Sequence, residues 1–350
     1  MAQNEVDNKV WQEDLNLLAK DEIFKSFSNS SILITGATGL IGSELVFSIL
    51  CANRLNNLNI KIYALVRNEN KAKEIFKNVL DNPNFNLIIQ DITSNIQIEE
   101  KIDYVIHCAN ITNSKIMVEK PAEVVDVTIN GIKNVLEFAK KNDIKSVLYL
   151  SSIEIYGENV SNKIDIKEDD YGFLDFNNVR NCYPLSKKMA EKLCLFYSDD
   201  YGVDVKIARL TQTFGAGISK DENRIFAQIA KAIIKNEDIV LKTDGLSAKN
   251  YCYITDTISA LLTILSKGQS REIYNVANYD SFISIKDLAL KMIDKYQSSK
   301  LVFDVKDNAM YPKNSKLKLN SSKLEALGWC AKVGLDEMFE RLINYLKEEN

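Results

Sequence analysis

A glycine-rich stretch directly after an apolar run constrains the fold of this chain more than any other feature. Residues 31–35 read SILIT, and residues 36–42 read GATGLIG. In a turn of this kind the first glycine permits a tight bend, the second lets a pyrophosphate approach backbone N–H groups, and the third lets the next helix pack closely on the strand. The sequence therefore predicts a strand, a dinucleotide-binding turn and a helix. The residues of this turn expected to bind the cofactor are Gly36, Thr38, Gly39, Leu40, Ile41 and Gly42.

Short apolar runs alternate with longer amphipathic stretches after this turn. The runs lie at residues 31–35, 61–66, 86–90, 103–109, 146–152 and 203–210, and helical patterns lie at 43–53, 124–141 and 186–201. Continuous apolar runs predict strands that are buried on both faces. The alternation predicts an α/β fold with a Rossmann-type, doubly wound parallel sheet. Ligands collect at the carboxyl ends of the strands in such sheets, so the residues after 35, 109 and 152 should meet at one crevice.

The length of the chain allows more than this sheet alone. A chain of 350 residues suits one large α/β unit with a smaller appendage. We predict a helical N-terminal extension at 1–30, a dinucleotide-binding domain at 31–211 and a mainly substrate-binding lobe at 212–350. Some strands or helices of the lobe are expected to return to the dinucleotide-binding domain, and a strand at 272–278 and a helix at 335–346 are predicted within residues 212–350.

Composition excludes several classes of partner. The formal net charge of −4 leaves no basic excess for a non-specific grip on nucleic acid or anionic lipid. No apolar stretch is long enough to span a bilayer, and the N-terminus lacks the pattern of a secretory signal. The six cysteines are scattered, which favours reduced thiols over a disulfide framework or a metal site. These features predict a cytoplasmic protein with a small-molecule partner.

The end of the second predicted strand bears on the choice of cofactor. This position usually supplies a carboxylate for the adenosine ribose, but here the chain has Arg67. An arginine can pair with a 2′-phosphate, so this residue favours NADP over NAD. The alternative is an exposed arginine at a strand end with no such function.

The third and fourth strands end in further candidates for cofactor binding. Asp91 can accept a hydrogen bond from the adenine amino group, and Ile92 can pack on the adenine ring. His107, the one histidine, is expected to be a packed strand residue. Small residues after it would let the cofactor lie over the backbone, and the positions concerned are Cys108, Ala109 and Asn110.

The predicted catalytic pair is Tyr183 and Lys187, in YPLSK at the start of a helix. The two residues are four apart and therefore lie on one helix face. Lys187 is expected to lower the tyrosine pKa and to hold the nicotinamide ribose, while Tyr183 removes a proton from a substrate hydroxyl as hydride leaves for the cofactor. Ser152, at the end of a predicted central strand, can share that proton. Together they predict a Ser-Tyr-Lys oxidoreductase site.

These motifs resemble those of the extended short-chain dehydrogenases known as the NAD-dependent epimerase/dehydratase family. The resemblance runs from about residue 31 to residue 346 and is carried by TGATGLIG, DYVIHCAN, SSIEIYG, YPLSK, ARLTQTFGAG, KNYCYITD and LNSSKLEALGW. It implies that the Ser-Tyr-Lys site oxidises C4 of a nucleoside-diphosphate sugar with an NAD or NADP that stays bound and is recycled. It also implies a homodimer formed through a helix bundle.

The resemblance further implies a set of residues near the substrate, and this chain departs from the family pattern at some of them. Gln212 stands where asparagine is common, Lys249 where an arginine often binds the diphosphate, and Thr128 where many relatives have an asparagine. The expected substrate-binding residues are Arg209, Gln212 and Lys249.

Glu154 bears most directly on the reaction type. A 4-keto sugar has an acidified C5 proton, which a nearby carboxylate can remove for elimination at C6 or epimerisation at C5. Simple C4 epimerisation needs no such base. Related dehydratases often carry Asp-Glu at this point, and others, like the uronate decarboxylases, carry Ser-Glu, whereas this chain has Ile153 before Glu154. Dehydration, decarboxylation and epimerisation all stay open, as does a solvent-exposed glutamate with no catalytic function.

Two other classes of function compete with this interpretation. Arg67 would suit an NADP-dependent carbonyl reductase of a non-nucleotide substrate. A non-catalytic NAD(P)-binding sensor would keep the nucleotide fold and lose the active site, and the intact Ser152, Tyr183 and Lys187 argue against it.

Overall fold

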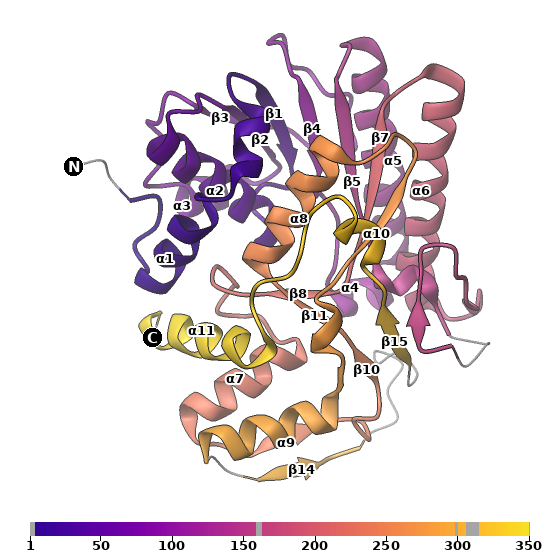
Figure 1. Ribbon diagram of the computed structural model, residues 1–350. Coiled ribbons are helices and arrows are strands. Elements are labelled where there is room, and N and C mark those ends of the chain that lie inside the picture. The colour runs from indigo at the N-terminus through magenta and orange to yellow at the C-terminus, as the bar shows by residue number, and fades with distance from the viewer. Residues whose placement is uncertain (1–3, 159–162, 298–299, 306–314, 350) are drawn as a thin grey trace.

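A seven-stranded parallel sheet forms the centre of the molecule. The computed structural model describes residues 4–158, 163–297, 300–305 and 315–349. The sheet has the strand order β12-β7-β5-β4-β1-β2-β3, and every neighbouring pair is parallel. This confirms the predicted α/β fold with a doubly wound parallel sheet (Figure 1). The strands are β1 (Ser31–Thr35), β2 (Lys61–Val66), β3 (Phe85–Ile89), β4 (Tyr104–His107), β5 (Ser146–Ser152), β7 (Val205–Leu210) and β12 (Ile273–Val276).

Helices cover both faces of this sheet. Helices α2 (Leu40–Asn56) and α8 (Ile254–Lys267) pack on one face, and α5 (Pro121–Lys141) and α6 (Cys182–Tyr201) pack on the other. Successive side chains of a strand point to opposite faces, so in β1 Ile32 and Ile34 join the first core while Leu33 joins the second. The apolar run of β1 is thus explained by burial on both sides.

Strand β3 differs from this prediction. It forms one edge of the sheet and is only partly buried along most of its length, so the expectation of burial on both faces is wrong for this run. An edge strand has a neighbour on one side alone, and the flanking helices do not reach over it fully. The fourth strand is also shorter than predicted and ends at His107, which leaves residues 108–110 in the loop at the carboxyl end of the sheet.

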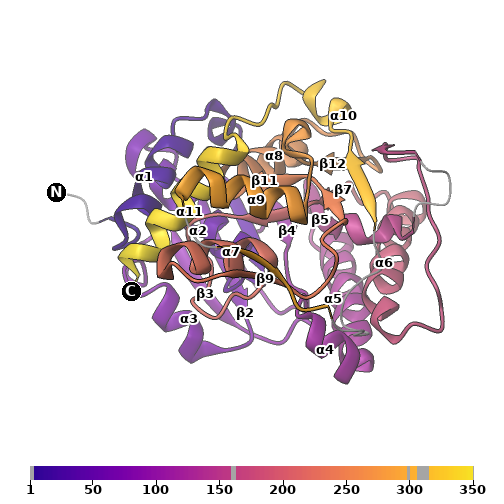
Figure 2. The ribbon, with the colours of Figure 1, turned by 90° about the horizontal axis from the view of Figure 1, so that it is seen from below.

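Residues after 212 contribute to two parts of the molecule. Strand β12 and helix α8 complete the main sheet and its cover, whereas α7 (Ile225–Lys235), α9 (Ile285–Tyr296) and α11 (Leu335–Glu348) lie beside one another below it (Figure 2). A small sheet has the order β13-β10-β15-β6, and β8 pairs with β11 and β9 with β14. The bounds are β6 (Asp165–Ile166), β8 (Gln212–Phe214), β9 (Ile239–Leu241), β10 (Ala248–Lys249), β11 (Tyr251–Tyr253), β13 (Ile283–Ser284), β14 (Leu301–Phe303) and β15 (Lys316–Leu319).

The other described elements are short or lie at the start of the chain. They are the α-helices α1 (Lys9–Leu18), α3 (Glu69–Ile75), α4 (Ser114–Glu119) and α10 (Ser322–Glu325), and the 3₁₀-helices η1 (Glu22–Phe27), η2 (Ile153–Tyr156), η3 (Val179–Asn181) and η4 (Tyr279–Ser281). Over the described residues, none of the helices combines the length and the apolar character that crossing a bilayer requires.

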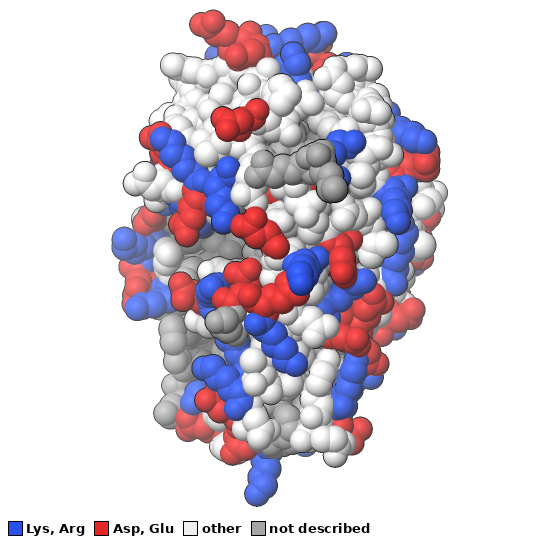
Figure 3. Space-filling view, turned by 90° about the vertical axis from the view of Figure 1, so that its left-hand side faces the viewer, with Lys and Arg blue, Asp and Glu red and all other residues white. Residues whose placement is uncertain are grey.

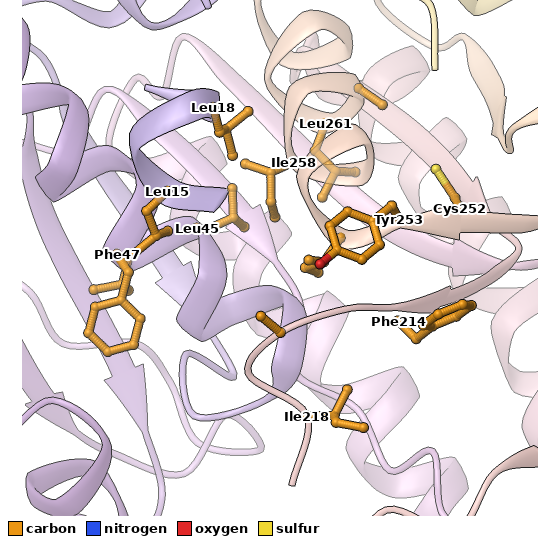
Figure 4. Packing of buried hydrophobic residues seen from close by; sticks show 14 of the residues in the cluster. Leu15, Leu18, Leu45, Phe47, Phe214, Ile218, Cys252, Tyr253, Ile258 and Leu261 are labelled. Carbon is orange, nitrogen blue, oxygen red and sulfur yellow. The ribbon is translucent and has the colours of Figure 1, made fainter. Parts of the chain in front are cut away.

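The N-terminal helix α1 packs on α2 and α8, on one side of the main sheet. Leu15 and Leu18 of α1 join the apolar core that also holds Leu45 of α2 and Ile258 of α8 (Figure 4). The indole N–H of Trp11 donates to the Glu44 carboxyl at 2.6 Å. Burial raises the pKa of Glu44 to about 8, so this carboxyl is mostly protonated at neutral pH.

The same helix also contacts the end of the chain. The Asp14 carboxylate accepts hydrogen bonds from the Tyr253 hydroxyl and from Arg341 of α11, both at 2.6 Å. The Lys9 N–H donates to Glu348 at 2.9 Å. The two ends of the described chain therefore lie side by side.

On the side of the molecule viewed in Figure 3, acidic and basic side chains are interspersed, with no extended patch of one sign.

Candidate active site

The glycine-rich turn lies at the carboxyl end of β1, against the loop after β4. Gly36 has a φ of +64°, and a Cβ added there would lie 2.5 Å from the Cα of Ala109. A Cβ at Gly42 would lie 2.5 Å from the Gly36 carbonyl oxygen. Helix α2 begins at Leu40 with Gly39 at its N-cap, and no side chain caps it. The first N–H groups of the helix therefore stay available to a phosphate, and the turn fits the pyrophosphate of a dinucleotide.

The side chains in this turn differ in what they can offer a cofactor. Leu40 and Ile41 pack in part against the core beneath α2 and stay partly exposed, so each can offer a backbone N–H group and some apolar side-chain surface. Thr38 is only partly buried. The turn thus presents mainly backbone to a ligand.

Arg67 and Asp91, both predicted on the adenosine side, lie close together. Arg67 Nη1 is 3.9 Å from Asp91 Oδ2, and the Arg67 side chain is 65% exposed. The backbone N–H of Thr93 donates to Asp91 and is the main cause that lowers the Asp91 pKa. The Thr93 hydroxyl and the positive charge of Arg67 lower this pKa further. Ile92 is buried in the core under α5, close to Gly131. Arg67 is exposed enough to turn either to Asp91 or to a ligand.

The loop after β4 is fixed by contacts with β1 and α5. The backbone N–H of Ala109 donates to Thr35 Oγ1 at 3.3 Å, and the Thr128 hydroxyl donates to Asn110 Oδ1 at 3.2 Å. Burial raises the pKa of Cys108 to about 12, so its thiol stays protonated. His107 Nδ1 lies 2.7 Å from Thr35 Oγ1, and burial lowers the His107 pKa to about 3. His107 is a packed, neutral strand residue, as expected.

The three predicted catalytic residues lie together. Ser152 is the last residue of β5; its hydroxyl accepts from the Glu154 backbone N–H at 3.2 Å and lies close enough to the Tyr183 hydroxyl to lower the Tyr183 pKa. Tyr183 and Lys187 are buried on the first turns of α6. Lys187 Nζ donates to the Leu150 carbonyl at 2.6 Å and lies 5.9 Å from the centre of the Tyr183 ring. The topology brings the end of β5 and the start of α6 together at the carboxyl edge of the sheet.

The pKa values in this cluster differ in part from expectation. Burial raises the pKa of Tyr183, and the negative charge of Glu154 adds to this, while the nearby Ser152 hydroxyl opposes it. The direction is opposite to the lowering expected from Lys187. Burial also lowers the pKa of Lys187 itself to about 7, and its amine is directed at the Leu150 carbonyl, so it gives Tyr183 little electrostatic help in this arrangement.

Glu154 is held by an arginine that the sequence did not single out. Arg180 Nη1 and Nη2 donate to the two Glu154 oxygens at 2.8 Å and 3.0 Å. Burial pushes the pKa of Glu154 upward, but the hydrogen bonds and charge of Arg180, with help from Lys249, lower it overall. The Glu154 side chain is 20% exposed, so the reading of a solvent-exposed loop glutamate is wrong. The only sequence signal for Arg180 is its position three residues before Tyr183.

A small cavity adjoins this pair. Its volume is about 70 Å³, and it is lined by residues that include Glu154, Arg180, Asn181, Pro184 and Lys249. Burial lowers the pKa of Lys249, against the attraction of Glu154. Ligand sites that enclose a whole small molecule measure about 300 Å³ or more. This cavity can therefore receive one substituent of a ligand and not a complete nucleotide.

The two other predicted substrate residues lie in different surroundings. Arg209 is 1% exposed, pairs with both oxygens of Glu191, and donates from Nη1 to the Tyr156 hydroxyl and the Glu168 carbonyl. Its guanidinium is largely engaged within the chain, which ties β7 to α6 and leaves little of it for a ligand. Gln212 begins β8 and is partly buried.

Another cavity lies away from the crevice. It measures about 350 Å³ and lies between η1, α8 and the segment around Trp329. Polar groups beside this cavity form hydrogen bonds with one another, as when Asp21 accepts from Ser259 and Lys332.

Among the described residues, no group of three or more His, Cys, Asp and Glu side chains has an arrangement that could hold a metal ion.

Comparison with known proteins gives consistent matches. Residues 32–277 match the family described as NAD dependent epimerase/dehydratase. UDP-glucuronic acid decarboxylase 6 of Arabidopsis thaliana is 26% identical over 312 residues, 89% of this chain and 87% of that protein. dTDP-D-glucose 4,6-dehydratase of Dictyostelium discoideum is 29% identical over 292 residues, 79% of this chain and 63% of that protein. The structure of UDP-glucuronic acid 4-epimerase from Bacillus cereus with NAD superimposes with a TM-score of 0.76 at 21% identity, covering 91% of this chain and 99% of that one.

Proposed function

The chain belongs to the NAD-dependent epimerase/dehydratase family of enzymes, and we propose that it oxidises a nucleoside-diphosphate sugar at C4 and then acts on the resulting 4-keto sugar. The observation that carries this proposal is the contact of Ser152 with Tyr183 at the carboxyl end of β5, in the crevice that also holds the glycine-rich turn. Similar proteins named as UDP-glucuronic acid decarboxylases and a dTDP-D-glucose 4,6-dehydratase support the substrate class. Solved structures of the same fold, named as complexes with UDP-glucose, UDP-glucuronic acid and NAD, agree with it.

In the first stage the chain moves a proton from the sugar. Tyr183, as the phenolate, accepts the proton of the C4 hydroxyl, and Ser152 hydrogen-bonds the C4 oxygen as it becomes a carbonyl oxygen. Lys187 turns from the Leu150 carbonyl to hold the ribose beside the nicotinamide. When bound, NAD supplies the acceptor for the C4 hydride and later returns it, and the positive charge of the oxidised ring favours ionised Tyr183. The buried position of Tyr183 keeps water from this proton.

In the second stage Glu154 is the proposed base. The 4-keto group acidifies the C5 proton, and Glu154, a carboxylate two residues beyond Ser152, is the proposed acceptor. Loss of a C6 substituent or return of the proton to the other face of C5 can follow this proton transfer. In decarboxylation the C5–carboxyl bond breaks instead, CO₂ leaves, and the resulting enolate takes up a proton at C5, for which protonated Glu154 would be the donor. Dehydration, decarboxylation and epimerisation therefore share the first stage.

The proposal is tested on the purified chain without added cofactor. We expect nicotinamide absorbance to rise transiently on addition of UDP-glucose, UDP-glucuronic acid or dTDP-glucose, and one of them to be converted by catalytic amounts of enzyme. Stoichiometric consumption of NADPH with a simple carbonyl compound would instead favour the carbonyl reductase. Absence of both reactions, with cofactor bound, would favour the non-catalytic sensor.

We propose NADP as the slightly preferred cofactor because of Arg67, which is exposed at the strand end. Arg67→Ala should weaken NADP binding about tenfold or more and change NAD binding little, since a charged hydrogen bond to the 2′-phosphate would be lost. Titration of both cofactors measures this. Arg271→Ala, another exposed arginine paired with an aspartate, is the control. If both affinities are unchanged by Arg67→Ala, the arginine does not select the cofactor.

Three further properties are the position of the substrate between domains, the location in the cell and the oligomeric state. We propose that the substrate lies between the dinucleotide-binding domain at 31–211 and the lobe at 212–350, that the protein acts in the cytoplasm, and that it forms a homodimer through α5 and α6. Support for the dimer comes from apolar side chains exposed on these helices, namely Val125, Met189 and Phe196.

A further inference from the structure

The cavity beside Glu154 is lined by two cations, Arg180 and Lys249, and by two carboxylates, Glu154 and Glu158. Both cations attract the Glu154 carboxylate. Arg180 is 7% exposed, and its Nε is buried with no hydrogen-bond partner. A buried donor without a partner is costly, and a charged donor bonds most strongly to an anionic oxygen, so Arg180 is suited to a further negatively charged acceptor.

The ion pair between Arg180 and Glu154 is poorly arranged for removal of a proton by Glu154. Arg180 donates to both carboxylate oxygens at once, so each oxygen has one lone pair engaged by the guanidinium. Hydrogen bonds to the charged form of an acid make it a weaker base. While the pair persists, Glu154 is therefore well positioned but held in a form with little tendency to take up a proton.

We propose that Arg180 is a positioning residue that holds Glu154 until an oxyanion of the substrate enters the cavity and takes over its guanidinium. This rests on the proposed function, because it concerns the base of the second stage. The oxyanion is either a carboxylate on the sugar or the diphosphate. The charged and titratable groups that face Glu154 are Arg180, Lys249 and Tyr183, and of these Arg180 alone donates to it.

Under this proposal, binding of the substrate makes Glu154 a stronger base. Once Arg180 has turned to the oxyanion, Glu154 keeps its buried surroundings but loses the two donors, and its pKa rises. Binding is then accompanied by proton uptake at a pH near the ordinary pKa of a glutamate. A pair with a purely structural function would stay closed and take up no proton.

Isothermal titration calorimetry tests the exchange with two probes, UDP-glucose and UDP-glucuronic acid. Arg180→Met keeps an unbranched, flexible side chain and removes the guanidinium with its charge. We expect it to weaken binding about tenfold or more, for both probes if the oxyanion is the diphosphate and for UDP-glucuronic acid alone if it is the carboxylate. Arg180→Lys, which keeps the charge without the second hydrogen bond, should lose less. It replaces Arg180→Met if that variant does not fold.

Arg54 offers a matched control. It makes a second bidentate pair, with Glu5, between α2 and the N-terminal segment. Arg54→Met removes a comparable ion pair away from the crevice and should leave the affinity for both probes unchanged. Three results would overturn the proposal. Arg180→Met and Arg54→Met could lose affinity to the same extent, or neither variant could lose affinity. The wild-type chain could also bind neither UDP-glucose nor UDP-glucuronic acid.

Proton uptake is measured by repeating the titration at about pH 5 in buffers of different ionisation enthalpy. We expect uptake by the wild-type chain with the probe whose affinity depends on Arg180, and none by Glu154→Gln. Uptake that is absent from the wild type, or unchanged in Glu154→Gln, contradicts release of Glu154. Reduction of the nicotinamide is followed separately, so a chain that shows the exchange but never reduces its cofactor would refute the proposed function and leave the exchange standing.

Discussion

Tyr183→Phe should abolish turnover while leaving cofactor binding intact. The phenylalanine ring fills the same buried place against Met117 and Val124, but the hydroxyl that receives the C4 proton is gone. General acid–base catalysis contributes about 10²- to 10⁴-fold to rate, and Tyr183 is the proposed acceptor of the C4 proton, so we expect a loss near the upper end of that range. The measurements are kcat with the active sugar nucleotide and the cofactor content of the purified variant.

A hydroxyl removed elsewhere on the same helix controls for effects on α6. Tyr197 lies further along α6 and donates to Glu137 on α5. Tyr197→Phe should retain most of the activity because that hydrogen bond is remote from the crevice. If Tyr183→Phe keeps a rate within about tenfold of the wild type, the Ser-Tyr-Lys mechanism is wrong for this chain.

Glu154→Gln should separate the two stages of the reaction. The amide cannot accept a proton, so product formation and exchange of the C5 hydrogen with deuterated solvent should fall by about 10²- to 10⁴-fold. Reduction of the bound cofactor on addition of the sugar nucleotide should persist, because that step depends on Tyr183. Absorbance of the reduced nicotinamide and mass spectrometry of the recovered sugar report the two stages independently.

The control for this variant is Glu5→Gln, which alters the carboxylate of the other bidentate pair, far from the sugar. It should leave both stages at the wild-type rate. Wild-type exchange and product formation in Glu154→Gln would instead exclude Glu154 as the second-stage base. C4 epimerisation, which requires no second base, would then be the better assignment.

Those features of the fold that depend on local constraints were predictable from the sequence. Gly36 and Gly42 are required where they are because a Cβ would meet backbone atoms at 2.5 Å. Runs such as 31–35 and 146–152 signal strands because both of their faces are covered. Since parallel strands place their carboxyl ends at one edge, Ser152 and the residues after β1 and β4 could be expected in one crevice.

Features that depend on the partner of a charged side chain were not predictable. Arg180 and Glu154 are 26 residues apart and meet only because the loop after η2 returns to the start of α6. Arg209 was expected near the substrate, but Glu191 on α6 engages it at the core side of β7. A sequence shows that an arginine is present but not whether a ligand or a carboxylate of the same chain neutralises it. The partial exposure of β3 is likewise a result of its position at the edge of the sheet.

The contact between α1 and α11 has a consequence for how the protein matures on the ribosome. Asp14 and Arg341 are 327 residues apart, so α1 emerges long before the helix that neutralises its buried carboxylate has been translated. Domains begin to fold during synthesis from the N-terminal side. Leu15 and Trp11 can dock on α2 early, but Asp14 acquires the charge of Arg341 only when the last segment has left the exit tunnel. A nascent chain interrupted before α11 would lack this ion pair, and burial, which raises the pKa of Asp14 to about 6 even beside Arg341, would then favour the protonated carboxyl.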